Sequence, residues 1–141
     1  MRFHWYILGE GKQRSALMNQ IEKNGVSDCF TLLGTRSNPY PYIKACTILV
    51  QTSDYEGKSV VLDEAKILAK PIVVTNYPTV RDQIIPESEG IIAEMTAESV
   101  AAAIQRILFE HDLRKNIESY LSSNDYGNRH EIYKYRKVID G

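Results

Sequence analysis

Residues 47–75, TILVQTSDYEGKSVVLDEAKILAKPIVVT, contain the pattern that decides the fold. Two short apolar runs, 47–53 and 71–75, flank a segment whose apolar residues recur at helical spacing over 59–69. Short continuous runs of Val, Ile and Leu are typical of strands buried on both faces, as in a parallel sheet. The stretch therefore predicts a strand–helix–strand unit, with Pro71 at the start of a strand, where proline is tolerated.

The rest of the chain repeats this alternation, which predicts an α/β fold with a parallel sheet covered by helices on both faces. Gly25 is expected to end the first helix, and Thr96 with Ser99 to cap a later one. The expected strands are 3–9, 29–34, 47–53, 71–75 and 90–94; the expected helices are 10–25, 59–69, 96–111, 112–123 and 128–140, with a helical turn in 38–46 and a loop over 76–84.

The composition is that of an ordinary globular protein. The 141 residues suit one domain, 43% are hydrophobic and 25% charged, and no apolar run approaches the roughly 18 residues of a membrane span. The net charge of −1 gives no reason to expect binding to nucleic acid. Cys29 and Cys46 lack metal-ligand spacing and are expected to be buried, reduced thiols of a cytosolic protein. His4, His111 and His130 share no spacing with acids and are expected to be structural or surface residues.

Ligands of open α/β sheets bind beyond the carboxyl ends of the strands, so the candidate site consists of the loops 9–11, 34–39, 53–59 and 75–80. The first loop, in ILGEGK, has a Gly-x-Gly but lacks the third glycine of the dinucleotide fingerprint. It is either a tight strand-to-helix turn or backbone that approaches a ligand phosphate at Gly9.

The loop 53–59 carries the stronger signal. The amides of Lys58, Ser59 and Val60 form the start of the helix 59–69, where unsatisfied N–H groups and the helix dipole favour a phosphate. Gly57 lets the backbone come close to it.

Glu56 and Glu64 lie eight positions apart, one before the helix and one inside it. Carboxylates would repel a phosphate but accept hydrogen bonds from hydroxyl groups. A ligand with a diphosphate between two polyols, as in a nucleotide sugar, fits this pattern. The structural alternatives stay open: Glu56 could simply complement the helix dipole, and Glu64 could be a solvated residue paired with Lys66 or Lys70.

EGKSVVLDEAKILAKPIVVT (56–75) resembles the nucleotide-binding motif of retaining GT-B glycosyltransferases of family 4, in which seven residues separate two glutamates. The resemblance covers nearly the whole chain in order, and NPYPYIKA (38–45) is most similar to bacterial transferases of capsular and other surface polysaccharides. It implies a Rossmann-like three-layer sheet that forms one half of a GT-B fold, with residues 1–141 as the C-terminal, nucleotide-sugar-binding domain.

The resemblance also implies roles for single residues. Glu64 would bind the ribose hydroxyls, and the catalytic Glu56 would bind hydroxyls of the transferred sugar. The amides of Lys58, Ser59 and Val60 would bind the distal phosphate. The loop with Thr35 and Arg36 would border the nucleobase.

The implied partners are a nucleoside-diphosphate sugar, a glycan or lipid-linked acceptor, and an N-terminal domain of the same enzyme that this chain does not contain. The resemblance also implies an Arg and a Lys ahead of residue 3 that neutralise the diphosphate, so we expect weak binding and no transfer by this chain alone. No cofactor is implied, and no metal, since there is no DxD motif. The implied location is cytoplasmic, with the missing domain as the contact to the inner membrane. Asp54 and Thr47 depart from the family pattern, and Asp54 adds negative charge near the site.

Three alternatives stand beside this interpretation. A nucleotide-sugar epimerase of GT-B fold would need histidine and acidic groups at the sugar end. A flavodoxin-like receiver domain would need an acidic pair near the first strand, where ILGEGK supplies one acid. A non-catalytic nucleotide-binding or interaction module is the remaining alternative.

Overall fold

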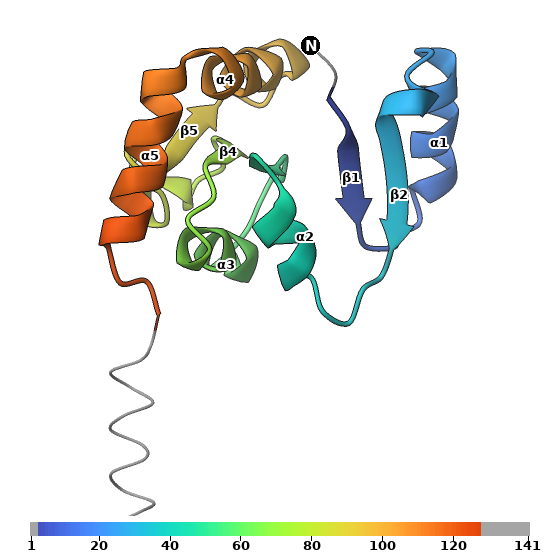
Figure 1. Cartoon of the computed structure of the whole chain (residues 1–141). Coiled ribbons are helices and arrows are strands. Elements are labelled where there is room, and N and C mark those ends of the chain that lie inside the picture. Colours follow the sequence, from blue (N-terminus) through green and yellow to red (C-terminus); the bar gives the residue numbers. More distant parts are fainter. Residues whose placement is uncertain (1–2, 128–141) are drawn as a thin grey trace, which may run out of the picture. The chain divides into compact units, whose positions relative to one another are not determined.

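The computed structural model describes residues 3–127, and these alternate between strands and helices as the sequence predicts (Figure 1). The expected helix at 128–140, with His130, lies outside the described residues. The elements are β1 (Trp5–Leu8), α1 (Arg14–Lys23), η1 (Ser27–Cys29), β2 (Phe30–Gly34), α2 (Tyr40–Ala45), β3 (Leu49–Gln51), α3 (Val60–Ile67), β4 (Ile72–Thr75), η2 (Val80–Asp82), β5 (Gly90–Ala93), α4 (Ala97–Phe109) and α5 (His111–Ser123).

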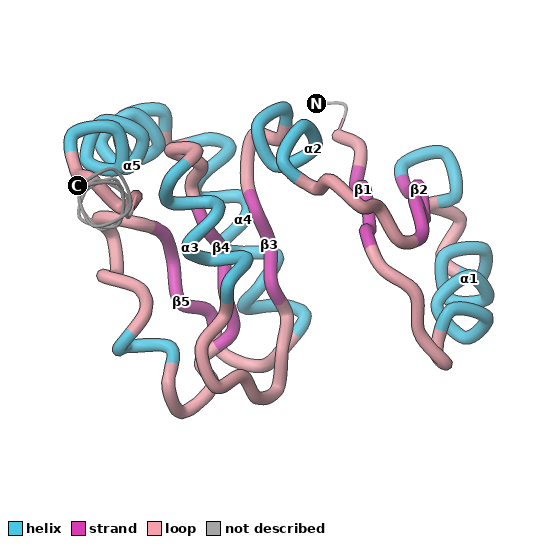
Figure 2. Tube along the Cα trace, turned by 90° about the horizontal axis from the view of Figure 1, so that it is seen from below, coloured by secondary structure: helices cyan, strands magenta, loops and turns pink. Residues whose placement is uncertain are grey.

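The chain divides into two compact units, Met1–Pro41 and Tyr42–Gly141. In the first unit, β1 and β2 pair in parallel, with the Trp5 and Phe30 rings stacked 5.7 Å apart. In the second, β3, β4 and β5 form a parallel sheet in the order β3-β4-β5 (Figure 2). The predicted parallel α/β architecture is confirmed, with the described strands distributed over these two sheets.

Strand β4 lies at the centre of its sheet and is buried along its whole length, which explains its apolar run Ile72–Val74. Successive side chains of a strand point to opposite faces. On one face, Ile72 and Val74 pack in a core with Leu62 of α3 and Ile43 of α2. On the other, Val73 packs in a second core with Ile107 and other residues of α4. Helices therefore cover both faces of this sheet, which makes three layers.

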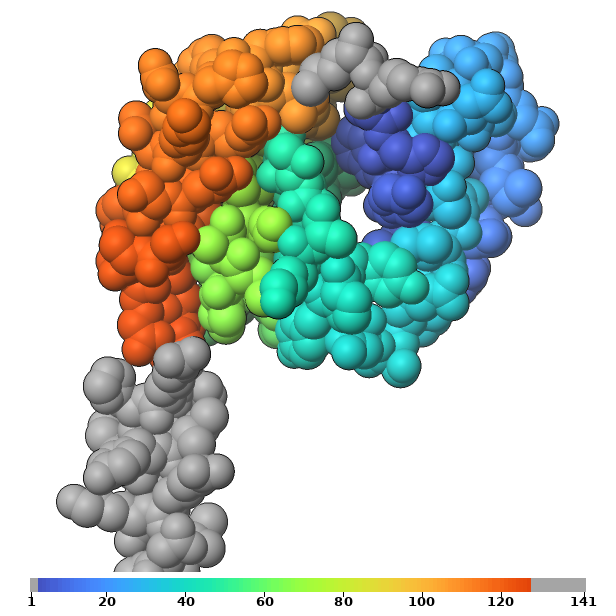
Figure 3. All heavy atoms as spheres, viewed as in Figure 1, coloured from blue at the N-terminus to red at the C-terminus, as the bar shows by residue number. Residues whose placement is uncertain are grey.

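Helix α5 packs against both α3 and α4 (Figure 3), so it lies along the edge of these layers. The sequence predicts that the helix 112–123 directly continues the helix 96–111, but the chain bends at Glu110, whose φ of −84° and ψ of 82° are not helical. The bend separates α4 from α5. Thr96 caps α4 as predicted, by accepting a hydrogen bond from the Ser99 amide at 3.2 Å.

Other boundaries shift by a few residues. The first helix begins at Arg14 rather than at residue 10, because the segment around Gly9 and Gly11 forms the strand-to-helix turn. Gly25 follows this helix with a φ of 66°, as expected for a glycine after a helix end. Cys29 and Cys46 are free thiols and half-buried rather than fully buried. No helix within residues 3–127 is long and apolar enough to cross a membrane.

Candidate functional site

The predicted site residues fall into two groups, one in each unit. Gly9, Thr35 and Arg36 follow β1 and β2 in the first unit, while Glu56 to Val60 and Glu64 lie between β3 and the middle of α3 in the second. Both groups lie at carboxyl ends of parallel strands or on the helix that follows, where α/β sheets bind ligands. Each group is described by itself below.

In the first unit, the loops that follow β1 and β2 are joined. The Gly9 amide donates to the Gly34 carbonyl at 2.9 Å, and both glycines have a left-handed φ, of 116° and 71°. A side chain on Gly34 would meet the Glu10 carboxylate at 2.8 Å, so only glycine fits there without a shift. Gly9 therefore forms a tight turn, and Thr35 and Arg36 follow Gly34 as exposed residues.

In the second unit, the loop 53–59 is tied to the sheet by Glu56. Its carboxylate Oε1 accepts hydrogen bonds from Gln51 Nε2 at 3.1 Å and from Ser53 Oγ at 2.9 Å. The Glu56 carbonyl accepts from Thr79 Oγ1 at 2.6 Å. These contacts turn the half-buried carboxylate toward the end of β3 and not onto the amides of α3, so Glu56 does not cap the helix.

Glu64 lies within α3 and is also half-buried, yet its carboxylate has no hydrogen bond or ion pair within the described part of the chain. The structural alternative would pair it with Lys66 or Lys70. Instead, Lys66 Nζ lies 3.5 Å from an oxygen of Asp63 and donates to the Gln83 carbonyl at 2.8 Å. A half-buried carboxylate without a protein partner is available to accept hydrogen bonds from a ligand.

The start of α3 has no side-chain cap. Ser59 is the N-cap residue, but its hydroxyl donates to Gln51 Oε1 at 2.8 Å and makes no bond to the helix. Serine at this position usually accepts a bond from an amide two or three residues on. Helix α3 thus leaves its N-terminal end without the usual side-chain acceptor, which favours an anion there.

Gln83 of the segment after η2 is already bonded to this helix start. Its Oε1 accepts from the Ser59 amide at 2.7 Å, and its Nε2 donates to the Gly57 carbonyl at 3.1 Å. Because an amide N–H only donates, the oxygen of the Gln83 side chain must face Ser59. A phosphate that binds the Ser59 amide would have to replace Gln83, whereas the Lys58 and Val60 amides are not bonded to it.

The lysine at the start of α3 forms an ion pair with an acid of the same helix. Lys58 Nζ lies 3.3 Å from Asp63, so its charge is shared with that carboxylate. Burial raises the pKa of the Tyr77 phenol, the Glu56 charge raises it further, and the nearby Gln83 side chain lowers it. The Tyr77 hydroxyl has no partner in good hydrogen-bond geometry among the described residues.

Two residues of this network, Gln51 and Gln83, were not predicted from the sequence. Gln51 is the first polar residue after the apolar run 48–50, and its place at the end of a predicted strand is a signal that could have found it. Gln83 lies 24 positions from Ser59 in a segment expected to be a loop, and no local pattern marks it.

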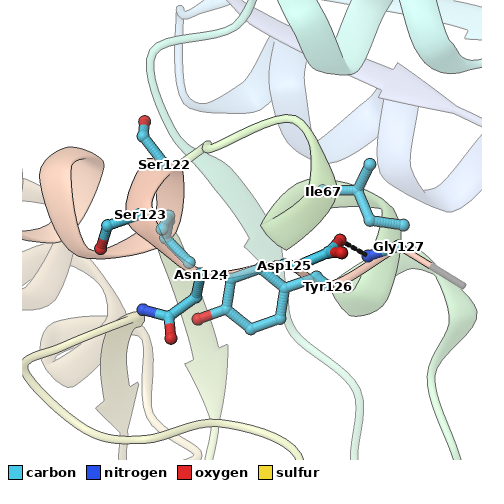
Figure 4. Close-up of a pocket in the computed structure, with 8 residues that line it drawn as sticks. Ile67, Ser122, Ser123, Asn124, Asp125, Tyr126 and Gly127 are labelled. Carbon is cyan, nitrogen blue, oxygen red and sulfur yellow. Dashed lines mark hydrogen bonds between the residues drawn. The ribbon is translucent and has the colours of Figure 1, made fainter. Parts of the chain in front are cut away.

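A hollow of about 410 Å³ lies elsewhere, between α3 and the segment that follows α5 (Figure 4). None of its lining residues is a predicted site residue; they are Ile67, Leu121, Ser122, Ser123, Asn124, Asp125, Tyr126 and Gly127. Within residues 3–127, no cluster of His, Cys, Asp and Glu side chains could bind a metal ion.

The fold matches solved structures, among them two that were determined with UDP. The pneumococcal O-GlcNAc transferase GtfA, solved with UDP and GlcNAc, matches with a TM-score of 0.81 and 18% identity over 97% of this chain and 29% of its own. Anabaena Alr3699/HepE, solved with UDP, matches with a TM-score of 0.79 and 19% identity over 86% of this chain and 35% of its own. The fold thus matches the C-terminal Rossmann-like half of the GT-B fold.

The family follows from the sequence itself. The family model described as glycosyl transferases group 1 matches residues 2–123, which is most of the chain. The chain therefore belongs to the group 1 glycosyltransferases, and the resemblance noted in the sequence is confirmed.

Two curated relatives are named as bacterial glycosyltransferases. The amylovoran biosynthesis glycosyltransferase AmsD of Erwinia amylovora is 24% identical over 95% of this chain and 39% of its own length. A Campylobacter jejuni protein, named N-acetylgalactosamine-N,N'-diacetylbacillosaminyl-diphospho-undecaprenol 4-alpha-N-acetylgalactosaminyltransferase, is 30% identical over 77% of this chain and 30% of its own length. The chain thus spans roughly a third of the length of these relatives.

Proposed function

We propose that residues 1–141 are the C-terminal donor-binding domain of a retaining glycosyltransferase and bind a nucleoside-diphosphate sugar. The observation that carries this proposal is the arrangement around α3: the anchored Glu56 precedes an uncapped helix start, and the unpaired Glu64 follows one turn inside the helix. Family membership and the UDP in two structures of the same fold support it.

The site would bind the donor through the hydroxyl groups of its two sugars, the ribose and the transferred sugar. Glu64 accepts hydrogen bonds from the ribose hydroxyls, and Glu56 from hydroxyls of the transferred sugar, because carboxylates are strong acceptors for hydroxyl donors. Between them, the start of α3 binds the distal phosphate through the amides of Lys58 and Val60. The Ser59 amide joins them when the phosphate replaces Gln83 Oε1.

The first unit would contribute the other contacts that the resemblance implies. Thr35, Arg36 and Gly9 are the residues of that unit assigned to donor binding from the sequence, and their roles stay predictions. Because Lys58 is paired with Asp63, its charge compensates a diphosphate only in part. Two phosphates near Glu56, Glu64 and Asp54 need cationic compensation, so we expect this chain alone to bind its donor weakly and not to transfer sugar.

In the full-length enzyme, the bond between the anomeric carbon and the diphosphate oxygen breaks, and a bond to the acceptor oxygen forms on the same face of the sugar. The acceptor proton goes to the departing diphosphate, so the protein mainly positions the reactants and stabilises charge. The acceptor is a glycan or lipid-linked glycan in surface polysaccharide synthesis, consistent with the names of the two relatives.

Calorimetric titration of the chain with UDP, GDP and ADP tests the proposal. We expect one diphosphate to bind, and we expect Glu64→Ala to weaken that binding about tenfold or more, because it removes charge-assisted hydrogen bonds to the ribose. Glu98→Ala is the matched control, since Glu98 is an exposed acid of α4, the helix on the opposite face of the sheet. Unchanged affinity in Glu64→Ala would remove the ribose role, and binding of none of the three diphosphates would remove the proposal.

A further inference from the structure

Gln51, the last residue of β3, connects the end of the sheet to both sides of the loop 53–59. Its Nε2 donates to Glu56 Oε1 and to Ser53 Oγ, each at 3.1 Å, and its Oε1 accepts from Ser59 Oγ at 2.8 Å. The direction of the amide is fixed by chemistry, because an ionised carboxylate only accepts hydrogen bonds. The half-buried Gln51 side chain is therefore bonded at both its oxygen and its nitrogen.

Only one of the two carboxylate oxygens of Glu56 accepts these hydrogen bonds. Gln51 and Ser53 both donate to Oε1, while Oε2 receives no hydrogen bond from the described residues. A carboxylate bonded on one oxygen has a fixed orientation and keeps the lone pairs of the other for a further donor. The free oxygen is the one that a hydroxyl of a bound sugar could reach.

Gln51 itself is held in place from two directions. Its backbone lies in the parallel pair with β4, opposite Val74, and its side-chain oxygen is anchored by the Ser59 hydroxyl at the start of α3. The chain of contacts from Ser59 through Gln51 to Glu56 thus links the helix start to the carboxylate. An orientation fixed by rigid neighbours costs less entropy when a ligand binds.

We propose that Gln51 is a positioning residue for the sugar end of the donor: it fixes the Glu56 carboxylate so that Oε2 faces the hydroxyls of the transferred sugar. The inference rests on the proposed function, because it assumes that Glu56 contacts the sugar. Gln51 acts through Glu56 and not on the substrate, so its loss should weaken the contribution of the sugar more than that of the nucleotide. If Gln51 only stabilised the loop, its loss would weaken the sugar and nucleotide contributions to binding equally.

The test compares the affinities of UDP, UDP-glucose and UDP-N-acetylglucosamine for the chain and its variants. Gln51→Met keeps the length of the side chain and removes its hydrogen bonds, and Gln51→Asn keeps the amide but shortens its reach. We expect either change to reduce the ratio of the UDP Kd to the sugar-nucleotide Kd about tenfold, as for a lost hydrogen bond to a charged group. Gln105→Met, on the exposed surface of α4, should leave the ratio unchanged.

A double-mutant cycle then assigns the effect to Glu56. In a Glu56→Gln background, Gln51→Met should change the ratio less than twofold, because the carboxylate that it positions is gone. Urea unfolding of each variant shows that the compared proteins are folded.

The possible failures are distinguishable. If UDP binds but Gln51→Met and Gln51→Asn leave the ratio unchanged, the positioning role is wrong and the proposed function stands. The role is also wrong if the variants lose the same affinity for UDP and for the two UDP-sugars. It is wrong as well if the sugar adds nothing to UDP binding in the unmodified chain. If no nucleotide binds, the proposed function fails and the positioning role fails with it.

Discussion

Gly57→Ala tests whether ligand binding requires a glycine at position 57 even though the fold does not. A Cβ built on Gly57 has no atom within 4 Å other than its own chain neighbours, and its φ lies outside the left-handed region. The carbonyl of Gly57, which accepts bonds from Thr79 Oγ1 and Gln83 Nε2 at 3.1 Å each, is not altered by the change. The protein should therefore tolerate alanine here.

The expected effects on stability and binding have opposite signs. Replacing a glycine whose conformation alanine can adopt raises the free energy of unfolding by about 0.4–1 kcal/mol, because the unfolded chain loses freedom. If a phosphate approaches the backbone at Gly57, the added methyl group crowds it at a cost of about 1–3 kcal/mol. That cost corresponds to a Kd about five- to 150-fold higher.

The assay measures urea unfolding and UDP calorimetry on the same preparation of Gly57→Ala. We expect an unchanged or higher unfolding midpoint together with weaker UDP binding. A Kd within twofold of that of the unmodified chain, at unchanged stability, would show that no ligand approaches the backbone at this position. A loss of stability would instead show that the loop 53–59 needs glycine for its own conformation.

Three further predictions concern the fold that supports the site. Gly90→Ala should lower the free energy of unfolding by about 1–3 kcal/mol, because its Cβ would clash with the Ile72 carbonyl oxygen; an unchanged urea midpoint would contradict the close packing of β4 and β5. Leu62→Ala, at a fully buried position of α3, should cost about 2–5 kcal/mol in the same measurement, and a loss under 1 kcal/mol would contradict its place in the core. Burial and the hydrogen bond to Glu89 raise the pKa of Tyr126, so its contribution to stability is complete below the ordinary pKa of about 10 and is lost as the pH rises above it. The melting temperature should therefore fall above pH 10, and Tyr126→Phe should reduce that fall; equal pH profiles for the two proteins would refute this.

The strand–helix–strand core could be predicted from the sequence because its pattern is local. The run IVVT at 72–75 predicts a strand buried on both faces, and both faces of β4 are covered. Gly25 and Thr96 marked helix boundaries through capping rules that involve only a few neighbouring residues. The bend at Glu110 was missed because neither glycine nor proline marks it.

The site could be predicted only in part, because some of its contacts join residues that lie far apart in the sequence. The positions of Glu56 before α3 and Glu64 within it follow from the predicted helix and are confirmed, whereas their roles toward a ligand remain predictions. The structure adds Gln51 and Gln83, which connect segments from different parts of the chain. A contact such as that between Gln83 and Ser59 depends on how β4 and α3 pack together, which no spacing in the sequence reveals.

The most direct test of the donor site is a titration of ¹⁵N-labelled chain with UDP-glucose, followed by the chemical shifts of the backbone amides. The account predicts that the largest shifts belong to Gly57, Lys58 and Val60 at the start of α3, together with Glu64, and that they saturate along a single binding curve. Shifts confined to the hollow beside Tyr126, or no shifts at millimolar UDP-glucose, would contradict it.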